Sequence, residues 1–183
     1  MRIDWLASAA VCALMMSSPA LAKDVVIHAG RLIDGVSKTP RAQVSILITD
    51  DRITGVQAGY VTPPGAEVID LKSGTVLPGL IDTHDHITAG FHKGDPIRNA
   101  VTITPYDVTI ESVGYARATL LAGFTSVRDV GSETGVVVAL KKAVKAGAIP
   151  GPRIWTSGGA IGPTGGHGDA ANGLDPDLDH PHW

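Results

Sequence analysis

The stretch that decides the fold is "TVLPGLIDTHDHI", residues 75–87, in which an apolar run ends at two histidines one residue apart. Side chains at positions i and i+2 of a strand point to the same face of a sheet. His84 and His86 are therefore expected to project together from the end of one strand, where two imidazole nitrogens can bind one divalent ion. Asp82 is expected to share that face and to orient an imidazole, whereas Asp85 is expected to point the other way.

The segment before this stretch has the pattern of a small β-sheet. Three runs rich in Val and Ile occupy residues 24–34, 42–57 and 66–77, and Gly, Asp and Pro residues that favour turns separate them. The middle run predicts a hairpin that turns near Asp51. A β-sheet module is therefore expected from residue 23 to residue 77.

Strands and helices alternate after residue 77. The pattern predicts a helix at about 105–122, a buried strand at 124–131, a second helix at 135–147 and a further strand at 152–161. Strands joined by helices through short links favour an α/β fold with a parallel sheet. This rhythm is typical of a (β/α)8 barrel, which takes about 250 residues. About a hundred residues follow the β-sheet module, so the pattern fits either a small open sheet or the first three βα units of an incomplete (β/α)8 TIM barrel. An isolated three-stranded parallel sheet would expose a long apolar edge, which favours the incomplete barrel.

The composition is that of a globular protein. The chain has 183 residues, a formal net charge of -3 and 44% hydrophobic residues. There is no basic excess or polybasic run to favour a nucleic acid or a membrane surface as a partner. Cys12 is the only cysteine, which excludes a disulfide framework within the chain. Cys12 lies within the first 22 residues, which are expected to be cleaved off. The remaining chain has no thiolate, so a transition metal would be bound by histidines and carboxylates.

The first 22 residues have the features of a secretory signal peptide. An arginine near the start precedes a short apolar stretch at residues 6–16, and Ala20-Leu21-Ala22 matches the pattern at which signal peptidase cuts. The apolar stretch is shorter than the ~20 residues that a membrane span needs. Cleavage after Ala22 is therefore expected, with the mature chain secreted or periplasmic and not held in a membrane.

Two later stretches carry further candidate residues. Asp129, at the end of the predicted strand, is a candidate for holding a metal ligand in place, and Arg128 beside it is interpreted as structural. His167 lies between glycines in "GGAIGPTGGHGD", residues 158–169. On the residues alone, His167 is a solvated loop histidine, and Asp169 is expected to cap or orient the loop.

The other histidines are expected to take no part in the site. His28 belongs to the β-sheet module and is expected to pack inside it, and His92, His180 and His182 are expected to be solvated. The glycine-rich loops lack the lysine that a phosphate-binding loop requires. The sequence contains no G-x-S-x-G motif, so it does not support a serine hydrolase of the α/β type.

Three stretches together resemble a known family. They are "VLPGLIDTHDHI", "ATLLAGFTSVRDVG" and "GGAIGPTGGHGD". In this order they are similar to sequences of the amidohydrolase superfamily, in the imidazolonepropionase-like branch that includes Xaa-Pro and Xaa-Arg dipeptidases. The resemblance implies a (β/α)8 barrel beside a composite β-sandwich. Residues 23–77 would be part of the sandwich domain, and residues 78–183 would be the N-terminal portion of the barrel.

The resemblance also implies a chemistry. Such enzymes hydrolyse C–N bonds with two metal ions, usually zinc, which activate water and polarise the scissile carbonyl. His84 and His86 match the H-x-H ligands, and His167 matches a loop residue that contacts the substrate. A carboxylated lysine, two further histidines and an aspartate that acts as general base have no counterpart in the chain. No catalytic residue is therefore assigned within it.

The expected function is that of an N-terminal fragment of an exported, metal-dependent amidohydrolase, dipeptidase-like and inactive by itself. The substrate would be a small amide or dipeptide, and the complete enzyme is compatible with a homo-oligomer. Two alternatives stay open. One is a hydrolase that opens cyclic amides of the imidazolone type, and the other is a truncated product without catalytic function.

Overall fold

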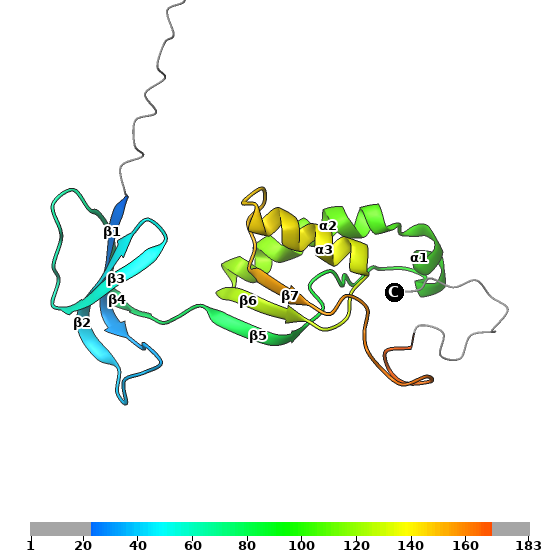
Figure 1. The fold of residues 1–183 in the computed structure, drawn as a ribbon, viewed down its shortest axis with the longest axis horizontal. Coiled ribbons are helices and arrows are strands. Elements are labelled where there is room, and N and C mark those ends of the chain that lie inside the picture. Colours follow the sequence, from blue (N-terminus) through cyan, green and yellow to red (C-terminus); the bar gives the residue numbers. More distant parts are fainter. Residues whose placement is uncertain (1–22, 170–183) are drawn as a thin grey trace, which may run out of the picture. The chain divides into compact units, whose positions relative to one another are not determined.

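The computed structural model describes residues 23–169 and divides the chain into two compact units, with the boundary between Leu77 and Pro78. The first unit is built of strands, and the second alternates strands and helices (Figure 1). The expected signal peptide at residues 1–22 lies outside the described residues, as do His180 and His182.

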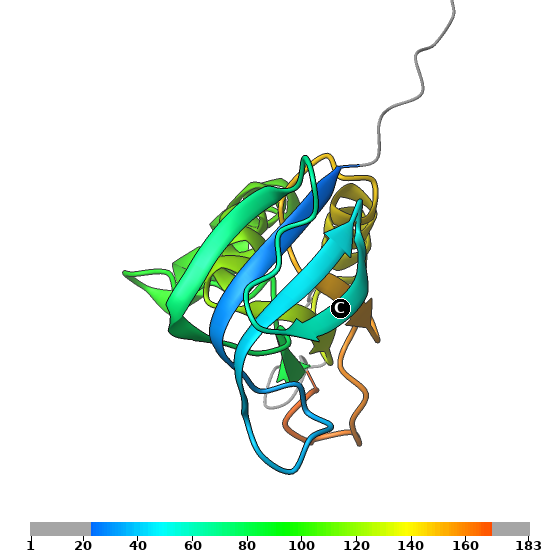
Figure 2. The same ribbon diagram turned by 90° about the vertical axis from the view of Figure 1, so that its left-hand side faces the viewer.

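The first unit contains a four-stranded sheet in the order β3-β2-β1-β4 (Figure 2). Its strands are β1 (Asp24–Leu32), β2 (Arg41–Thr49), β3 (Arg52–Ala58) and β4 (Glu67–Val76). β2 and β3 form the predicted hairpin, and Asp50 in its turn has a φ of 54°. β1 runs antiparallel to β2 and parallel to β4. The predicted β-sheet module is therefore present.

Aliphatic side chains of β1 and β2 form the core of the first unit: Ala29, Leu32, Val44 and Ile46. His28 is also buried, at 5% exposure. Its Nε2 lies 3.2 Å from the carbonyl oxygen of Val61 and 3.3 Å from Oγ1 of Thr62, in the segment that joins β3 to β4. The expectation that His28 packs inside the module is confirmed.

The second unit contains a three-stranded parallel sheet in the order β5-β6-β7. The strands are β5 (Leu80–Asp85), β6 (Phe124–Asp129) and β7 (Arg153–Thr156), and the helices are α1 (Pro96–Thr102), α2 (Pro105–Leu121) and α3 (Thr134–Lys145). α2 and α3 lie on the same side of the sheet (Figure 1). The fold is mixed α/β with parallel pairing, as predicted, and α1 is an addition. Within residues 23–169, no helix is long and apolar enough to cross a membrane.

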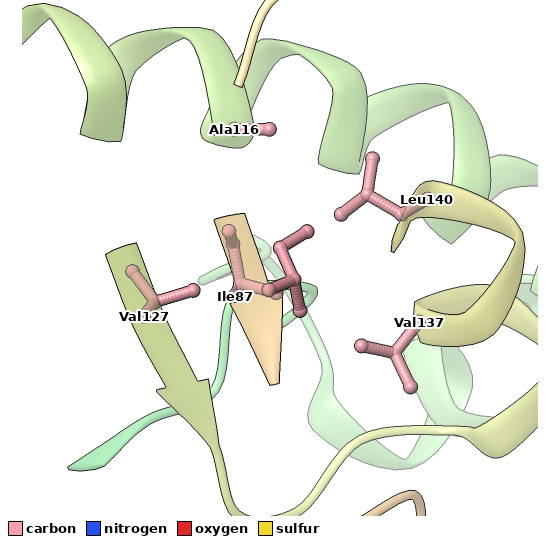
Figure 3. Close-up of a cluster of buried hydrophobic side chains, with 6 residues drawn as sticks. Ile87, Ala116, Val127, Val137 and Leu140 are labelled. Atoms are coloured by element: carbon pink, nitrogen blue, oxygen red, sulfur yellow. The ribbon is translucent and has the colours of Figure 1, made fainter. Parts of the chain in front are cut away.

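Apolar side chains from the sheet and from the two long helices, α2 and α3, meet in one cluster (Figure 3). Its buried members are Ile87, Ala116, Val127, Val137, Leu140 and Ile154. Full burial of a side chain such as valine or leucine stabilises a fold by about 1.5–3 kcal/mol. Because Ile87 is the second residue after β5, this cluster also anchors the chain just after His86.

Local signals set the ends of the two long helices. The Thr104 hydroxyl accepts the N–H of Asp107, and the Asp107 carboxylate accepts the N–H of Thr104, which is a capping box at the start of α2. Gly123 follows α2 with a φ of 97°, and Gly147 follows α3 with a φ of 70°. Glycine adopts this left-handed conformation at little cost, so both helices end where the sequence predicted.

Candidate metal centre

The two histidines of the H-x-H stretch lie side by side at the carboxyl end of β5. His84 is the penultimate residue of the strand, and His86 follows its last residue. Their ring centroids are 5.5 Å apart, with the ring planes at 73°. Two imidazoles that share one tetrahedral ion, at metal–nitrogen distances of about 2 Å, have centroids about 5 Å apart. The spacing and chemistry of the pair therefore fit two ligands of one divalent cation.

A contact with the loop after β6 fixes the ring of His86. Its Nδ1 lies 2.6 Å from the carbonyl oxygen of Gly131. Because a carbonyl only accepts hydrogen bonds, Nδ1 is the donor, and in the neutral imidazole Nε2 then keeps the lone pair that a metal requires. A side chain at Gly131 would lie 3.2 Å from Cε1 of His86, so glycine gives the ring room. The sequence alone did not identify Gly131.

Asp129, two residues before Gly131, is fully buried. Its Oδ2 accepts the N–H of Ile87 at 2.9 Å and the hydroxyl of Ser132 at 2.6 Å. Its Oδ1 accepts the hydroxyl of Thr156 at 3.2 Å. Asp129 thus connects the carboxyl ends of β5, β6 and β7. None of these three bonds involves an imidazole.

Asp82 contacts the backbone of the histidine pair. Its Oδ1 accepts the backbone N–H of His84 at 3.0 Å. Asp82 pairs with Val127 and Asp85 pairs with Asp129, with a register shift between the two pairs. Paired residues of parallel strands point to the same face, so Asp82 and Asp85 both lie on the face that carries Val127. An extra residue in β5 interrupts the strand alternation between Asp82 and Asp85. The expectation that Asp82 shares the histidines' face and orients an imidazole stays a prediction.

The surroundings of the histidine pair are acidic. Oδ1 of Asp85 accepts the backbone N–H of His86 at 2.8 Å. Partial burial raises the pKa of Asp85, and the charges of Asp82 and Asp129 act in the same direction, although the bond to His86 opposes the shift. A group of carboxylates at one end of the sheet favours a cation over an anion.

Two basic residues outside the pair contact neighbouring elements. Arg128 donates from Nε to the carbonyl oxygen of Thr83 at 2.6 Å, a contact between β6 and β5 that agrees with its structural interpretation. The Nε2 of His92 lies 2.7 Å from Oε2 of Glu111 on α2. The Tyr115 hydroxyl donates to the same carboxylate at 3.3 Å. His92 is exposed, as expected, and its contact with Glu111 connects the loop after β5 to α2.

His167 lies exposed on the loop after β7. The loop is held by two turns, in which Gly166 donates its N–H to the carbonyl of Pro163 at 2.9 Å and Gly165 donates to Oδ2 of Asp169 at 2.7 Å. Asp169 therefore orients the loop, as expected. Within residues 23–169, no hydrogen bond connects the ring of His167 to the histidine pair.

The histidine pair is not accompanied by a third metal donor among the described residues. Between residues 23 and 169 there is no group of three or more His, Cys, Asp and Glu side chains that could hold a metal ion. A catalytic zinc ion typically has three protein ligands and an open position. The histidine pair therefore offers fewer donors than a catalytic zinc ion typically has.

Comparison with known proteins agrees with this geometry. Residues 75–178, more than half of the chain, match the amidohydrolase family, and this range includes the histidine pair and the Asp129–Gly131 loop. The chain belongs to the amidohydrolase family. Members of this family are typically metal-dependent hydrolases, in keeping with the paired imidazoles and their acidic surroundings.

Similar proteins include several hydrolases. A Xaa-Pro dipeptidase with methionine bound in its active site superimposes with a TM-score of 0.77 and 35% identity, over 87% of this chain and 39% of that one. The ochratoxinase of Aspergillus niger is 28% identical over 160 residues, which cover 85% of this chain and 32% of that protein. The imidazolonepropionase of Fusobacterium nucleatum subsp. nucleatum is 34% identical over 80 residues, 41% of this chain and 19% of that protein. This chain spans about a third of the length of the ochratoxinase.

Proposed function

We propose that this chain is the N-terminal part of an exported, metal-dependent amidohydrolase that hydrolyses C–N bonds in small, dipeptide-like substrates. The observation that carries the proposal is the pair of imidazoles at the end of β5, 5.5 Å apart, with Nδ1 of His86 on a backbone carbonyl. The similarity to a Xaa-Pro dipeptidase supports the substrate class, and the share of the relatives' length that the chain covers supports a longer protein.

The second unit would supply the first three βα units of a (β/α)8 barrel, and residues 23–77 would supply part of a composite β-sandwich. The parallel order β5-β6-β7, with both long helices on one face, supports this arrangement. His84 and His86 would then project from the carboxyl end of the first barrel strand, where such enzymes place their chemistry. The remaining metal ligands and the general base would come from later strands.

In the complete site, His84 and His86 would hold one of two divalent cations, with zinc the first candidate. A cation bound there supplies Lewis-acid polarisation of the scissile carbonyl and activation of a water nucleophile. His86 would present Nε2, because the carbonyl of Gly131 keeps the proton on Nδ1. The carboxylates of Asp82 and Asp85 would hold the backbone of the two histidines in place by accepting its N–H groups.

His167 would contact the substrate. Its glycine neighbours leave the imidazole accessible, and Asp169 fixes the shape of the loop. In the complete enzyme, His167→Ala is expected to raise KM, because His167 is assigned to substrate binding and not to metal binding. The affinity for the metal is expected to stay unchanged in this variant.

Titration of the 183-residue chain with Co2+ tests the histidine pair. Binding of one ion is expected, and His84→Ala and His86→Ala should each abolish it, because a single imidazole cannot hold the ion. His92→Ala is the matched control, since His92 binds Glu111 and should leave Co2+ binding intact. All proteins should carry alanines at His180 and His182 to exclude stray binding. Binding that survives the loss of His84 and His86 would contradict the proposal.

The isolated chain is expected to be inactive. With zinc, the 183-residue protein should not turn over Xaa-Pro dipeptides or N-acyl amino acids at rates typical of enzymes. The DNA downstream of the codon for Trp183 should carry an open frame that encodes a strand-borne lysine, two histidines and an aspartate. An immediate stop codon would instead favour a product without catalytic function.

A cyclic-amide hydrolase is the second candidate. The 34% identity to an imidazolonepropionase, although over 80 residues only, supports it. A substrate panel on the full-length protein separates the two candidates, because turnover of Xaa-Pro dipeptides favours the first and opening of imidazolone rings favours the second.

Export through the signal peptide at residues 1–22 is supported by sequence features alone. The mature protein is expected in the periplasm or the medium, with Lys23 as its first residue. N-terminal sequencing of the protein from each cell fraction identifies its first residue and its compartment. A cytoplasmic product that keeps Met1 would contradict export.

A further inference from the structure

We infer that Asp129 is a positioning residue for His86. Its buried carboxylate holds the backbone next to His86, which carries the donor Nδ1, and the loop that carries the acceptor carbonyl of Gly131. It thereby determines which imidazole nitrogen is available to a cation. The role toward a cation rests on the proposed function. The role toward the ring does not, because the protonation pattern of His86 can be measured without metal.

The first side of that bond is the backbone that carries His86. Oδ2 of Asp129 accepts the N–H of Ile87, the next residue, at 2.9 Å. The side chain of Ile87 is buried in the cluster of the second unit, at 3% exposure. Asp85 accepts the N–H of His86 itself at 2.8 Å. Hydrogen bonds therefore hold the backbone on both sides of the His86 Cα atom. The ring can then move only by rotation about its side-chain torsions.

The second side is the loop that carries the acceptor. The same Oδ2 of Asp129 accepts the hydroxyl of Ser132, the residue after Gly131, at 2.6 Å. The N–H of Ser132 donates to the carbonyl of Gly158 at 2.9 Å, and the N–H of Ser157 donates to the carbonyl of Asp129 at 3.1 Å. The Gly131 carbonyl is thus fixed relative to β7 as well as to β5.

One oxygen atom therefore serves both sides. Oδ2 accepts from Ile87 beside the imidazole and from Ser132 beside the carbonyl that the imidazole binds. A buried carboxylate can accept both bonds at once, whereas an apolar side chain accepts neither. Loss of either bond should loosen the carbonyl relative to the ring. The proton of His86 would then distribute between Nδ1 and Nε2, and an Nε2 that carries a proton cannot bind a metal.

The test compares two serine variants of the 183-residue chain. Ser132→Ala removes a bond to Oδ2 of Asp129. Ser157→Ala is the matched control, because Ser157 lies in the neighbouring loop and its hydroxyl faces the carbonyls of Gly158 and Gly159 at 3.4 Å. Asp129→Ala removes both sides together. Ser132→Thr restores the hydroxyl and serves as the rescue.

The first readout is the proton position on each histidine ring in the metal-free folded protein, from long-range 1H–15N NMR spectra. The wild type and Ser157→Ala should show His86 protonated at Nδ1. Ser132→Ala and Asp129→Ala should show a rising share of the Nε2–H form, which Ser132→Thr reverses. His84 is the internal reference and should not change, since within residues 23–169 no hydrogen bond to its ring is found. If Asp129→Ala does not fold, Ser132→Ala decides the question.

The second readout is Co2+ affinity. Loss of a group that orients a metal-binding histidine typically costs about 10- to 100-fold in affinity, so Asp129→Ala should fall in that range and Ser157→Ala should match the wild type. Unchanged ring protonation in both Ser132→Ala and Asp129→Ala overturns the inference. If the protonation shifts as expected but the wild type does not bind Co2+, the positioning role stands and the proposed metal site fails.

Discussion

Two glycines in and after α2 have opposite backbone requirements. Gly123 has a φ of 97°, which an L-residue adopts at a cost, whereas Gly114 lies inside the helix and no atom would lie within 4 Å of an added Cβ. Gly123→Ala should therefore lower the free energy of unfolding by about 1 kcal/mol. Gly114→Ala should raise it by up to about 1 kcal/mol. Urea unfolding measures both, and changes of the same sign would contradict this assignment of the helix end.

Asp34 is an acid in the turn after β1 whose pKa is lowered by neighbouring donors. Its carboxylate accepts the N–H groups of Ser37 and Val36 and the hydroxyl of Ser37, and these bonds lower its pKa from 3.8 to about 2. Ser37→Ala should raise the pKa part of the way back, because both N–H groups remain, and Ser37→Thr should keep it low. NMR titration of the carboxyl group measures the pKa of Asp34 in the wild type and in both variants.

The same shift gives a pH dependence. Because the pKa of Asp34 is lower in the folded chain, the turn stabilises the fold above the ordinary value of 3.8, and this contribution is lost as the pH falls towards about 2. Ser37→Ala should narrow the pH range over which stability is lost. A wild-type Asp34 that titrates near 3.8 would show that the turn is not formed in solution.

Sequence patterns predicted local features of the site and missed its long-range contacts. The neighbouring positions of His84 and His86 follow from strand alternation, which is a local property. The bond from His86 to Gly131 joins residues 45 apart and depends on the pairing of β5 with β6. The register shift between Asp82 and Asp85 was also missed, because one extra residue in a strand leaves no mark in a short sequence pattern.

Longer elements were more predictable than short ones. α2 and α3 combine a helical repeat of apolar residues with a glycine stop, and apolar residues of that repeat, Ala116 and Leu140, lie in the core. α1 spans seven residues, which is less than two full turns of helical repeat. Such a segment carries too little periodicity to distinguish a helix from a loop.

The capping box of α2 makes a prediction about that helix as a unit. Thr104→Ala removes the hydroxyl that accepts the N–H of Asp107, so the free energy of unfolding should fall by about 1 kcal/mol. It should also raise the pKa of Asp107, because the Thr104 hydroxyl is the largest cause of its lowered value. Thr104→Ser retains the hydroxyl and should preserve both properties. Urea unfolding and NMR titration provide the measurements, and an unchanged Thr104→Ala protein would exclude the capping box.

At the scale of the whole chain, the two units have separate hydrophobic clusters that share no residue. The candidate metal ligands, Gly131 and Asp129 all belong to the second unit. A ligand that binds only the folded state stabilises it by about 2.7 kcal/mol at 100 times its Kd. Zinc should therefore stabilise the second unit selectively.

Hydrogen exchange followed by mass spectrometry measures this selectivity. With zinc, peptides that cover β5 and the loop after β6 should exchange more slowly, because local opening there releases the bound ion. Peptides from β1 and β2 should exchange at an unchanged rate, since their bonds lie within their own sheet. His86→Ala should abolish the effect of zinc on β5. Equal protection of the β2–β3 hairpin and of β5 would show that zinc acts on the chain elsewhere than at the histidine pair.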